Sequence, residues 1–149
     1  MTDSLDHRLL SEAIALSRNA PASNTAFSVG SIIANGEGTV LATGYSRERG
    51  PQSHAEQVAI EKALEMQVDL HASTLYTSLE PCSVRGSGLR ACTARILDVG
   101  IPRVVFALRE PAVFVEGQGV EVLADAGVEV IELDSQAPLV AQINAHLLH

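Results

Sequence analysis

Four residues have the types and spacing of a metal-dependent hydrolytic site. His54 and Glu56 stand one residue apart in the stretch "QSHAEQVAIEKAL", and Cys82 and Cys92 are the two cysteines of the chain. Histidine and cysteine are common zinc ligands, and a nearby carboxylate can act as a general acid or base. A helix that simply begins at His54 with an acidic first turn would also place His54 and Glu56 here. The positions of the two cysteines therefore decide between a metal site and an ordinary helix start.

The pattern of apolar residues predicts strands and helices that alternate along the chain. The segment 27–46 reads as two strands joined by the turn "NGEG", which is typical of a β-hairpin. We expect further strands at 72–79, 102–108 and 128–133, and helices at 5–19, 54–64, 90–100, 119–127 and 137–148. Helices between successive strands indicate parallel pairing. The expected fold class is α/β, a three-layer α/β/α sandwich whose mixed five-stranded sheet begins with the antiparallel hairpin.

This order of elements brings the four residues to one edge of the sheet. Cys82 follows the strand 72–79, and Cys92 lies near the start of the next helix, whose N-terminal dipole favours a thiolate. His54 opens the preceding helix. Ligands of such sheets collect at the carboxyl ends of the parallel strands. Each residue alone could be structural, but their coincidence at one edge favours a metal site.

The number of ligands indicates a catalytic zinc rather than a structural one. Structural zinc sites usually have four protein ligands, whereas catalytic sites have three and leave one position for water. His54, Cys82 and Cys92 make three, so we expect one zinc ion per chain. Zinc lowers the pKa of its bound water to about 7, and Glu56 could take the proton of that water. The remaining histidines are expected on the surface: His7, His71, His146 and His149.

Length, charge and composition limit the possible partners. A chain of 149 residues is the size of one domain, so we expect a single domain over 1–149 that contains the zinc site. The net charge of -8 argues against a nucleic-acid binder, and the absence of tryptophan leaves few rings for base stacking. No stretch reads as a signal peptide or a membrane span. We expect a cytoplasmic protein that acts on a small molecule.

The motif residues resemble a known superfamily. The runs His54-Ala55-Glu56 and Glu80-Pro81-Cys82, followed by a later cysteine, are similar to the signature of the cytidine-deaminase-like zinc enzymes. The stretches "GIPRVVFALREP" and "GQGVEVLADAGVEVIEL" are similar to the pyrimidine deaminase domain of riboflavin biosynthesis. The resemblance implies a zinc-dependent hydrolytic deaminase in which Glu56 is the acid and base. It also implies a homodimer or a higher homo-oligomer.

Two departures from that family concern the substrate. Nine residues separate the cysteines, and this insertion carries Arg85 and Arg90, the first candidates for contacts to a substrate phosphate. Arg47 and Arg49 are the second candidates. Asn24 stands in the run "SNTAFSVG", where the riboflavin enzymes usually carry Asn-Pro closer to Val-Gly, and it is a candidate substrate-binding residue. The chain ends at His149, so we expect a stand-alone deaminase without a fused reductase.

Three functions remain open from the sequence. The first is deamination of a phosphoribosylated diaminopyrimidine of the riboflavin pathway. The second is deamination of a cytosine nucleotide, a nucleoside or another amino-heterocycle. The third, of a different class, is a non-catalytic scaffold stabilised by zinc. A structural zinc site has no need of Glu56, so this residue separates the scaffold from the two enzymes.

Overall fold

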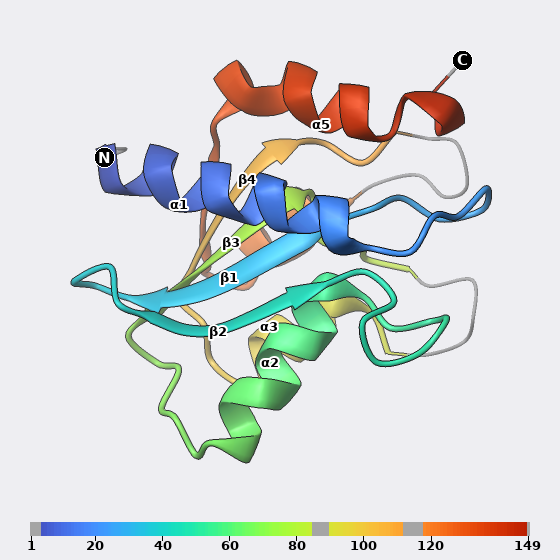
Figure 1. Ribbon diagram of the computed structural model, residues 1–149. Helices are drawn as coiled ribbons and strands as arrows, with labels where there is room; N and C mark the ends of the chain where they lie inside the picture. Colours follow the sequence, from blue (N-terminus) through green and yellow to red (C-terminus); the bar gives the residue numbers. More distant parts are fainter. Residues whose placement is uncertain (1–3, 85–89, 112–117, 149) are drawn as a thin grey trace.

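A mixed β-sheet lies between two layers of helices in the computed structural model, which describes residues 4–84, 90–111 and 118–148 (Figure 1). The sheet confirms the expected α/β class and the number of strands. Its strands are β1 (Gly30–Asn35), β2 (Val40–Tyr45), β3 (Ser73–Leu79), β4 (Arg103–Leu108) and β5 (Glu129–Glu132). Among the described residues, no helix combines the length and the apolar character needed to cross a bilayer.

The strand order across the sheet is β2-β1-β3-β4-β5. β1 pairs antiparallel with both β2 and β3, and β3, β4 and β5 run parallel to one another. The hairpin of β1 and β2 and the parallel strands that follow are therefore as the sequence predicted. The parallel pairs place the carboxyl ends of β3 and β4 at the same edge, next to the amino ends of the helices that follow them.

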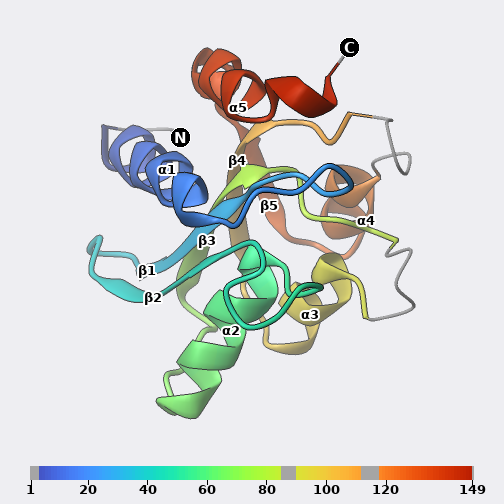
Figure 2. The ribbon, with the colours of Figure 1, turned by 45° about the vertical axis from the view of Figure 1, so that its right-hand side comes forward.

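In the described part of the chain, five α-helices cover the two faces of the sheet, as Figures 1 and 2 show. α1 and α5 lie on one face, and α2, α3 and α4 lie on the other. Their bounds are α1 (Ser4–Leu16), α2 (Ala55–Glu65), α3 (Cys92–Asp98), α4 (Gly119–Asp125) and α5 (Ala137–Ile143). Short 3₁₀ turns occupy Ser17–Asn19, Asp134–Gln136 and Ala145–Leu147. This is the three-layer arrangement expected from the alternation of strands and helices.

The apolar core has two halves because alternate residues of a strand point to opposite faces. Ile33, Leu75 and Val104 are paired neighbours in β1, β3 and β4, and all three are completely buried in the half that also contains residues of α2, α3 and α4. The next residues along each strand, Ile32, Tyr76 and Val105, pack in the half under α1 and α5. Burial on both faces explains why the central strands carry so few charged residues.

A buried polar cluster attaches α1 to the edge of the sheet opposite the candidate site. Asp6 is 2% exposed, and its carboxylate accepts hydrogen bonds from the Tyr76 hydroxyl at 2.6 Å and from Arg103 at 2.7 and 2.9 Å. Arg103 also contacts Glu129 at 3.0 Å. Because the buried charge of Asp6 is paired and hydrogen-bonded, it can be accommodated inside the protein.

The expected continuous helix over 137–148 is wrong at Asn144, where α5 ends. The side chain of Asn144 is buried, accepts the backbone N–H of Ser28 at 2.7 Å, and donates to the carbonyls of Val140 and Ser28 at 3.1 and 3.2 Å. A side-chain amide that binds backbone groups in this way competes with continuation of the helix. The interruption ties the C-terminal segment to the loop before β1.

Close contact between β2 and α2 depends on Gly44. A β-carbon at this position would lie 2.3 Å from the carbonyl oxygen of Ala55 and 2.8 Å from the backbone nitrogen of Ala59. Both atoms belong to the backbone of α2 and cannot rotate away. A glycine in β2 therefore sets the distance between the sheet and the first turn of the helix that follows His54.

We predict that Gly44→Ala lowers the free energy of unfolding by about 1–3 kcal/mol, because the added methyl group displaces α2 from the sheet. Gly36→Ala is the matched control, since a β-carbon there meets nothing within 4 Å. Urea unfolding of both variants measures the difference. Equal stability of the two variants would contradict the proposed packing constraint.

Candidate active site

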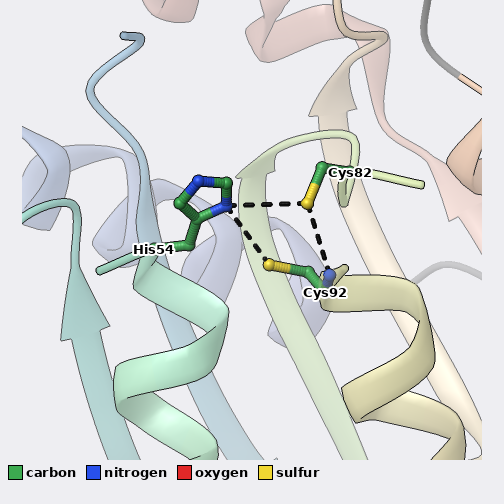
Figure 3. Close-up of side chains that lie close together, drawn as sticks. All are labelled: His54, Cys82 and Cys92. Atoms are coloured by element: carbon green, nitrogen blue, oxygen red, sulfur yellow. Dashed lines mark hydrogen bonds between the residues drawn. The ribbon is translucent and has the colours of Figure 1, made fainter. Parts of the chain in front are cut away.

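His54, Cys82 and Cys92 converge at the carboxyl end of β3 (Figure 3). The Nδ1 atom of His54 lies 3.6 Å from Sγ of Cys82 and 3.4 Å from Sγ of Cys92. The three ligand atoms all lie within 4.8 Å of one another. Both cysteines are buried and unoxidised, and His54 is partly buried. The structure thus brings together the three residues that the sequence predicted as metal ligands.

A short closed loop positions His54 at the start of α2. The Ser53 hydroxyl donates to the carbonyl of Gly50 at 3.1 Å and accepts the N–H of Arg49 at 3.1 Å. His54 is the residue before the first helical turn, and its own N–H donates to the Gln57 side chain at 3.4 Å. The loop and this capping interaction fix the backbone from which the imidazole projects.

The two cysteines are linked through the start of α3. The N–H of Cys92 donates to Sγ of Cys82 at 3.3 Å, and the N–H of Thr93 donates to the carbonyl of Cys82 at 3.1 Å. A hydrogen bond with the Cys92 side chain, together with His54, lowers the pKa of Cys82 to about 4, although burial acts in the opposite direction. The lowered pKa favours the thiolate form of Cys82, which is the form that binds metals.

The donor set fits zinc. Two sulfur atoms and one imidazole nitrogen are typical zinc ligands, and three protein ligands leave a coordination position for another molecule. A closed structural site would need a fourth ligand. Within the described part of the chain, the group of potential metal-binding side chains consists of these three residues alone.

Glu56 lies in the first turn of α2 and is 4% exposed. Burial, and then the negative charge of Cys82, raise the pKa of Glu56 to about 7, while His54 and a hydrogen bond with Thr77 lower it. The Thr77 hydroxyl itself accepts a hydrogen bond from Ser31 at 2.9 Å. Two buried hydroxyls from β1 and β3 thus orient the carboxyl group. A carboxyl with a pKa near neutrality can both accept and donate a proton.

A cavity of about 450 Å³ opens beside these residues and is large enough for a small heterocycle. Its lining includes His54, Glu56 and Cys82 together with residues of the loop before β1. Further residues that line it are Thr25, Ala26, Phe27, Val29, Ser46, Arg47, Gln52, Ser53, Leu79, Glu80, Val84 and Glu110. The apolar residues of this lining can pack against the faces of a ring, and the polar residues can hydrogen-bond to the atoms at its edges.

The substrate-binding candidates from the sequence lie in different places. Asn24 is exposed and is not among the residues that line the cavity, although Thr25 next to it is. Arg90 forms an ion pair with Asp98 of α3 at 2.6 Å and does not line the cavity either. Arg85 lies outside the described residues. The roles proposed for these three residues remain predictions.

Of the two second-choice arginines, the structure places Arg47 at the cavity, whereas Arg49 pairs with Glu65 at 2.6 Å. The guanidinium of Arg47 donates to the carbonyl of Pro21 at 2.6 and 2.9 Å and to that of Phe27 at 3.2 Å. Its backbone is left-handed, with φ of 63°, and burial lowers its pKa. Among the described residues that line the cavity, Arg47 is the only arginine or lysine.

Glu110 is a cavity residue that the sequence analysis missed. It follows β4 at the same edge of the sheet as Cys82, and its N–H donates to Oε1 of Glu80 at 2.9 Å. The other oxygen of Glu80 accepts the N–H of Val120 at 2.9 Å, so Glu80 links the segment after β4 to the first turn of α4. Burial, and then the charge of Cys82, raise the pKa of Glu110 to about 8. An acidic residue two positions after a buried parallel strand was the available signal.

Comparison of the sequence with known protein families identifies the family of this chain. Residues 3–108 match the profile of the cytidine and deoxycytidylate deaminase zinc-binding region. The chain belongs to this family. The match spans His54, Glu56, Cys82 and Cys92, and it confirms both the expected resemblance and the zinc cofactor.

Relatives and solved structures narrow the resemblance to the riboflavin branch. The chain is 42% identical, over 73% of its length, to the diaminohydroxyphosphoribosylamino-pyrimidine deaminase of Schizosaccharomyces pombe, of which it covers 27%. It resembles the bifunctional deaminase and reductase of Thermotoga maritima with a TM-score of 0.78 and 31% identity, covering 95% of this chain and 39% of that one. A deaminase of Aspergillus oryzae gives a TM-score of 0.84 at 25% identity, covering 95% and 91%. The chain spans about a quarter of the length of the curated relatives it matches.

We predict that purified protein carries about one zinc ion per chain, and that His54→Ala or Cys92→Ala loses most of it, because three ligands leave none to spare. Elemental analysis after dialysis measures the zinc content. His71→Ala is the control, since this side chain is 77% exposed and does not belong to the group of metal ligands. Full zinc occupancy in Cys92→Ala would show that the site lies elsewhere.

Proposed function

We propose that the chain is a zinc-dependent hydrolytic deaminase of a small amino-pyrimidine. The observation that carries this proposal is the position of Glu56, which is buried beside a three-ligand metal site and lines a cavity. A general acid and base is needed to exchange an amino group for oxygen, and a structural zinc site does not need one. The assignment of His54, Cys82 and Cys92 as ligands and of Glu56 as the catalytic residue is part of the proposal.

Each residue has a distinct task in the proposed reaction. His54, Cys82 and Cys92 would hold the zinc ion, which would lower the pKa of a bound water to about 7. Glu56 takes one proton from the attacking water and donates it to the ring nitrogen, and it then takes the second proton of the same oxygen and passes it to the departing amine. Water adds to the aminated carbon and ammonia leaves, so that the amino group becomes a carbonyl. Ser31 and Thr77 hold Glu56 in place through their chain of hydrogen bonds.

The substrate that we propose is a diaminohydroxyphosphoribosylamino-pyrimidine. The names of the Schizosaccharomyces and Thermotoga proteins specify this compound, and both proteins are at least 30% identical to the chain over the aligned part. The cavity has the size and the mixed lining that such a ring requires. Deamination of a cytosine nucleotide is the second candidate, supported by the family match alone.

Arg47 is the residue that we propose to contact the substrate phosphate. Its hydrogen-bond partners are all uncharged oxygens, and no carboxylate pairs with it among the described residues. The remaining ionisable side chains in the lining include the acidic residues Glu56, Glu80 and Glu110, which do not attract an anion. A phosphate would therefore be directed towards Arg47, which can bind it through charge-assisted hydrogen bonds.

The organisation of the protein in the cell is also a proposal. We expect residues 1–149 to act as one deaminase domain in the cytoplasm, because its relatives are named as biosynthetic enzymes. We also expect a homo-oligomer. Leu64 and Met66 at the end of α2 are 53% and 56% exposed, and apolar side chains of this kind are often covered by a second subunit.

We predict that Glu56→Gln keeps its fold and its zinc but loses deamination by about a thousandfold, because the amide cannot carry the proton. Ammonia release from the diaminopyrimidine, with zinc content measured on the same sample, tests this. Glu121→Gln makes the same chemical change on an exposed carboxylate and serves as the control. Near-normal turnover in Glu56→Gln would exclude Glu56 as the general acid and base.

We predict that Arg47→Gln raises KM for the phosphorylated substrate by about tenfold or more, while kcat falls much less. The corresponding compound without phosphate should show little change, since it lacks the anion. Comparing kcat/KM for the two compounds separates phosphate binding from a general effect on the loop that Arg47 holds.

Arg90→Ala provides a second comparison, because the sequence analysis placed Arg90 in the phosphate site and the structure pairs it with Asp98. We expect this variant to keep the preference for the phosphorylated compound. If Arg90→Ala abolishes that preference and Arg47→Gln does not, the segment between the cysteines binds the phosphate instead.

A further inference from the structure

Glu110 carries an unsatisfied polar atom at the wall of the cavity. Its Oε2 atom is buried and has no hydrogen-bond partner among the described residues, the only such side-chain atom found in that part of the chain. Buried polar groups are almost always hydrogen-bonded, so each exception calls for a physical reason. Since Glu110 lines the same cavity as His54 and Glu56, a ligand in that cavity is the natural partner.

The backbone of Glu110 is held firmly, which argues against an accidental orientation. Its N–H donates to Glu80, and Glu80 is 2% exposed and also binds the N–H of Val120. Gly119 allows this close packing, because a β-carbon there would lie 2.0 Å from the carbonyl oxygen of Pro81. The loop that carries Glu110 is thus fixed to the segment that carries Cys82, while the Glu110 carboxyl itself can rotate about its last torsion.

A carboxyl group accepts a hydrogen bond through its carbonyl oxygen even when it is protonated, so Glu110 favours ligands that present an N–H group to it. The diaminohydroxyphosphoribosylamino-pyrimidine named for the relatives has a second amino group and a ribosylamino N–H besides the amine that leaves. A cytosine ring has one amino group, which is the leaving group, and it otherwise presents a carbonyl, a ring nitrogen acceptor and C–H bonds. Glu110 would accept a hydrogen bond from the diaminopyrimidine, whereas cytosine would leave it without a hydrogen-bond donor.

We propose that Glu110 is a specificity-determining residue that accepts a hydrogen bond from an N–H group of the diaminopyrimidine other than the amine that leaves. This inference rests on the proposed deaminase function and adds to it the feature that distinguishes the substrate from cytosine nucleotides. A site built to hydrogen-bond a particular polar group strongly rejects analogues that lack it, because its own buried group is then unpaired.

The test compares Glu110→Gln with the unaltered zinc-loaded enzyme on the diaminopyrimidine and on dCMP. We expect KM for the diaminopyrimidine to rise by about tenfold or more, with a smaller change in kcat. Any activity on dCMP should be unchanged or higher. The value of kcat/KM for the diaminopyrimidine divided by that for dCMP should therefore fall. Glu121→Gln, a nearby exposed carboxylate, is the matched control and should leave the ratio unchanged.

A stability measurement separates this role from a structural one. Because the Oε2 atom of Glu110 makes no hydrogen bond in the described structure, Glu110→Gln should keep or raise the melting temperature. A lower melting temperature together with equal losses on both substrates would overturn the inference and make Glu110 a structural residue. An unchanged KM for the diaminopyrimidine would also overturn it.

The outcome also distinguishes this inference from the proposed function. Binding of the diaminopyrimidine to zinc-loaded Glu56→Gln protein, with and without the additional Glu110→Gln change, can be measured by calorimetry without turnover. Weaker binding in the double variant supports the inference. If the unaltered enzyme deaminates neither compound, the proposed function fails, whereas normal deamination with unchanged binding in the Glu110 variant rejects the inference alone.

Discussion

The arrangement of His54, Cys82 and Cys92 around a single point is the constraint on which the rest of the site depends. The three side chains come from two helix starts and from the residues that follow β3, and His54 and Cys92 are 38 positions apart in the chain. Their distance is fixed by backbone contacts, including the approach of β2 to α2 at Gly44 and the hydrogen bonds from the start of α3 to Cys82. Metal binding at this point therefore reports on the packing of the whole central sheet.

Several acidic side chains lie beside the metal ligands at the carboxyl edge of the sheet. Glu56, Glu80 and Glu110 line the same cavity as Cys82, and the charge of Cys82 contributes to the raised pKa of Glu56 and Glu110. A divalent cation held by the thiolates offsets part of that negative charge. Folding and metal binding are therefore coupled, because the ligands must be deprotonated and assembled together. Arg47 supplies a positive charge elsewhere on the cavity wall.

Much of the fold and the metal site could be predicted from the sequence because the signals are local. The spacing of His54 and Glu56, the position of Cys82 after an apolar strand, and the alternation of elements were enough for the sheet and its edge. Arg47, Glu110 and Asn144 were harder to assign. The assignment of Arg47 rests on its left-handed backbone, and that of Glu110 rests on its unpaired oxygen. The end of α5 at Asn144 rests on contacts with Ser28, which is 116 residues away in the chain. Such properties arise only from tertiary structure.

X-ray absorption at the zinc edge tests the central claim most directly, because it counts the ligand atoms by type. Two cysteines, one histidine and one water predict two sulfur atoms at about 2.3 Å and two lighter atoms at about 2.0–2.1 Å from the metal. Addition of an inhibitor that binds the metal should change only the lighter atoms, because the fourth position is open. A shell with three or more sulfur atoms, or with no sulfur at all, would contradict the assignment of His54, Cys82 and Cys92 as the ligands.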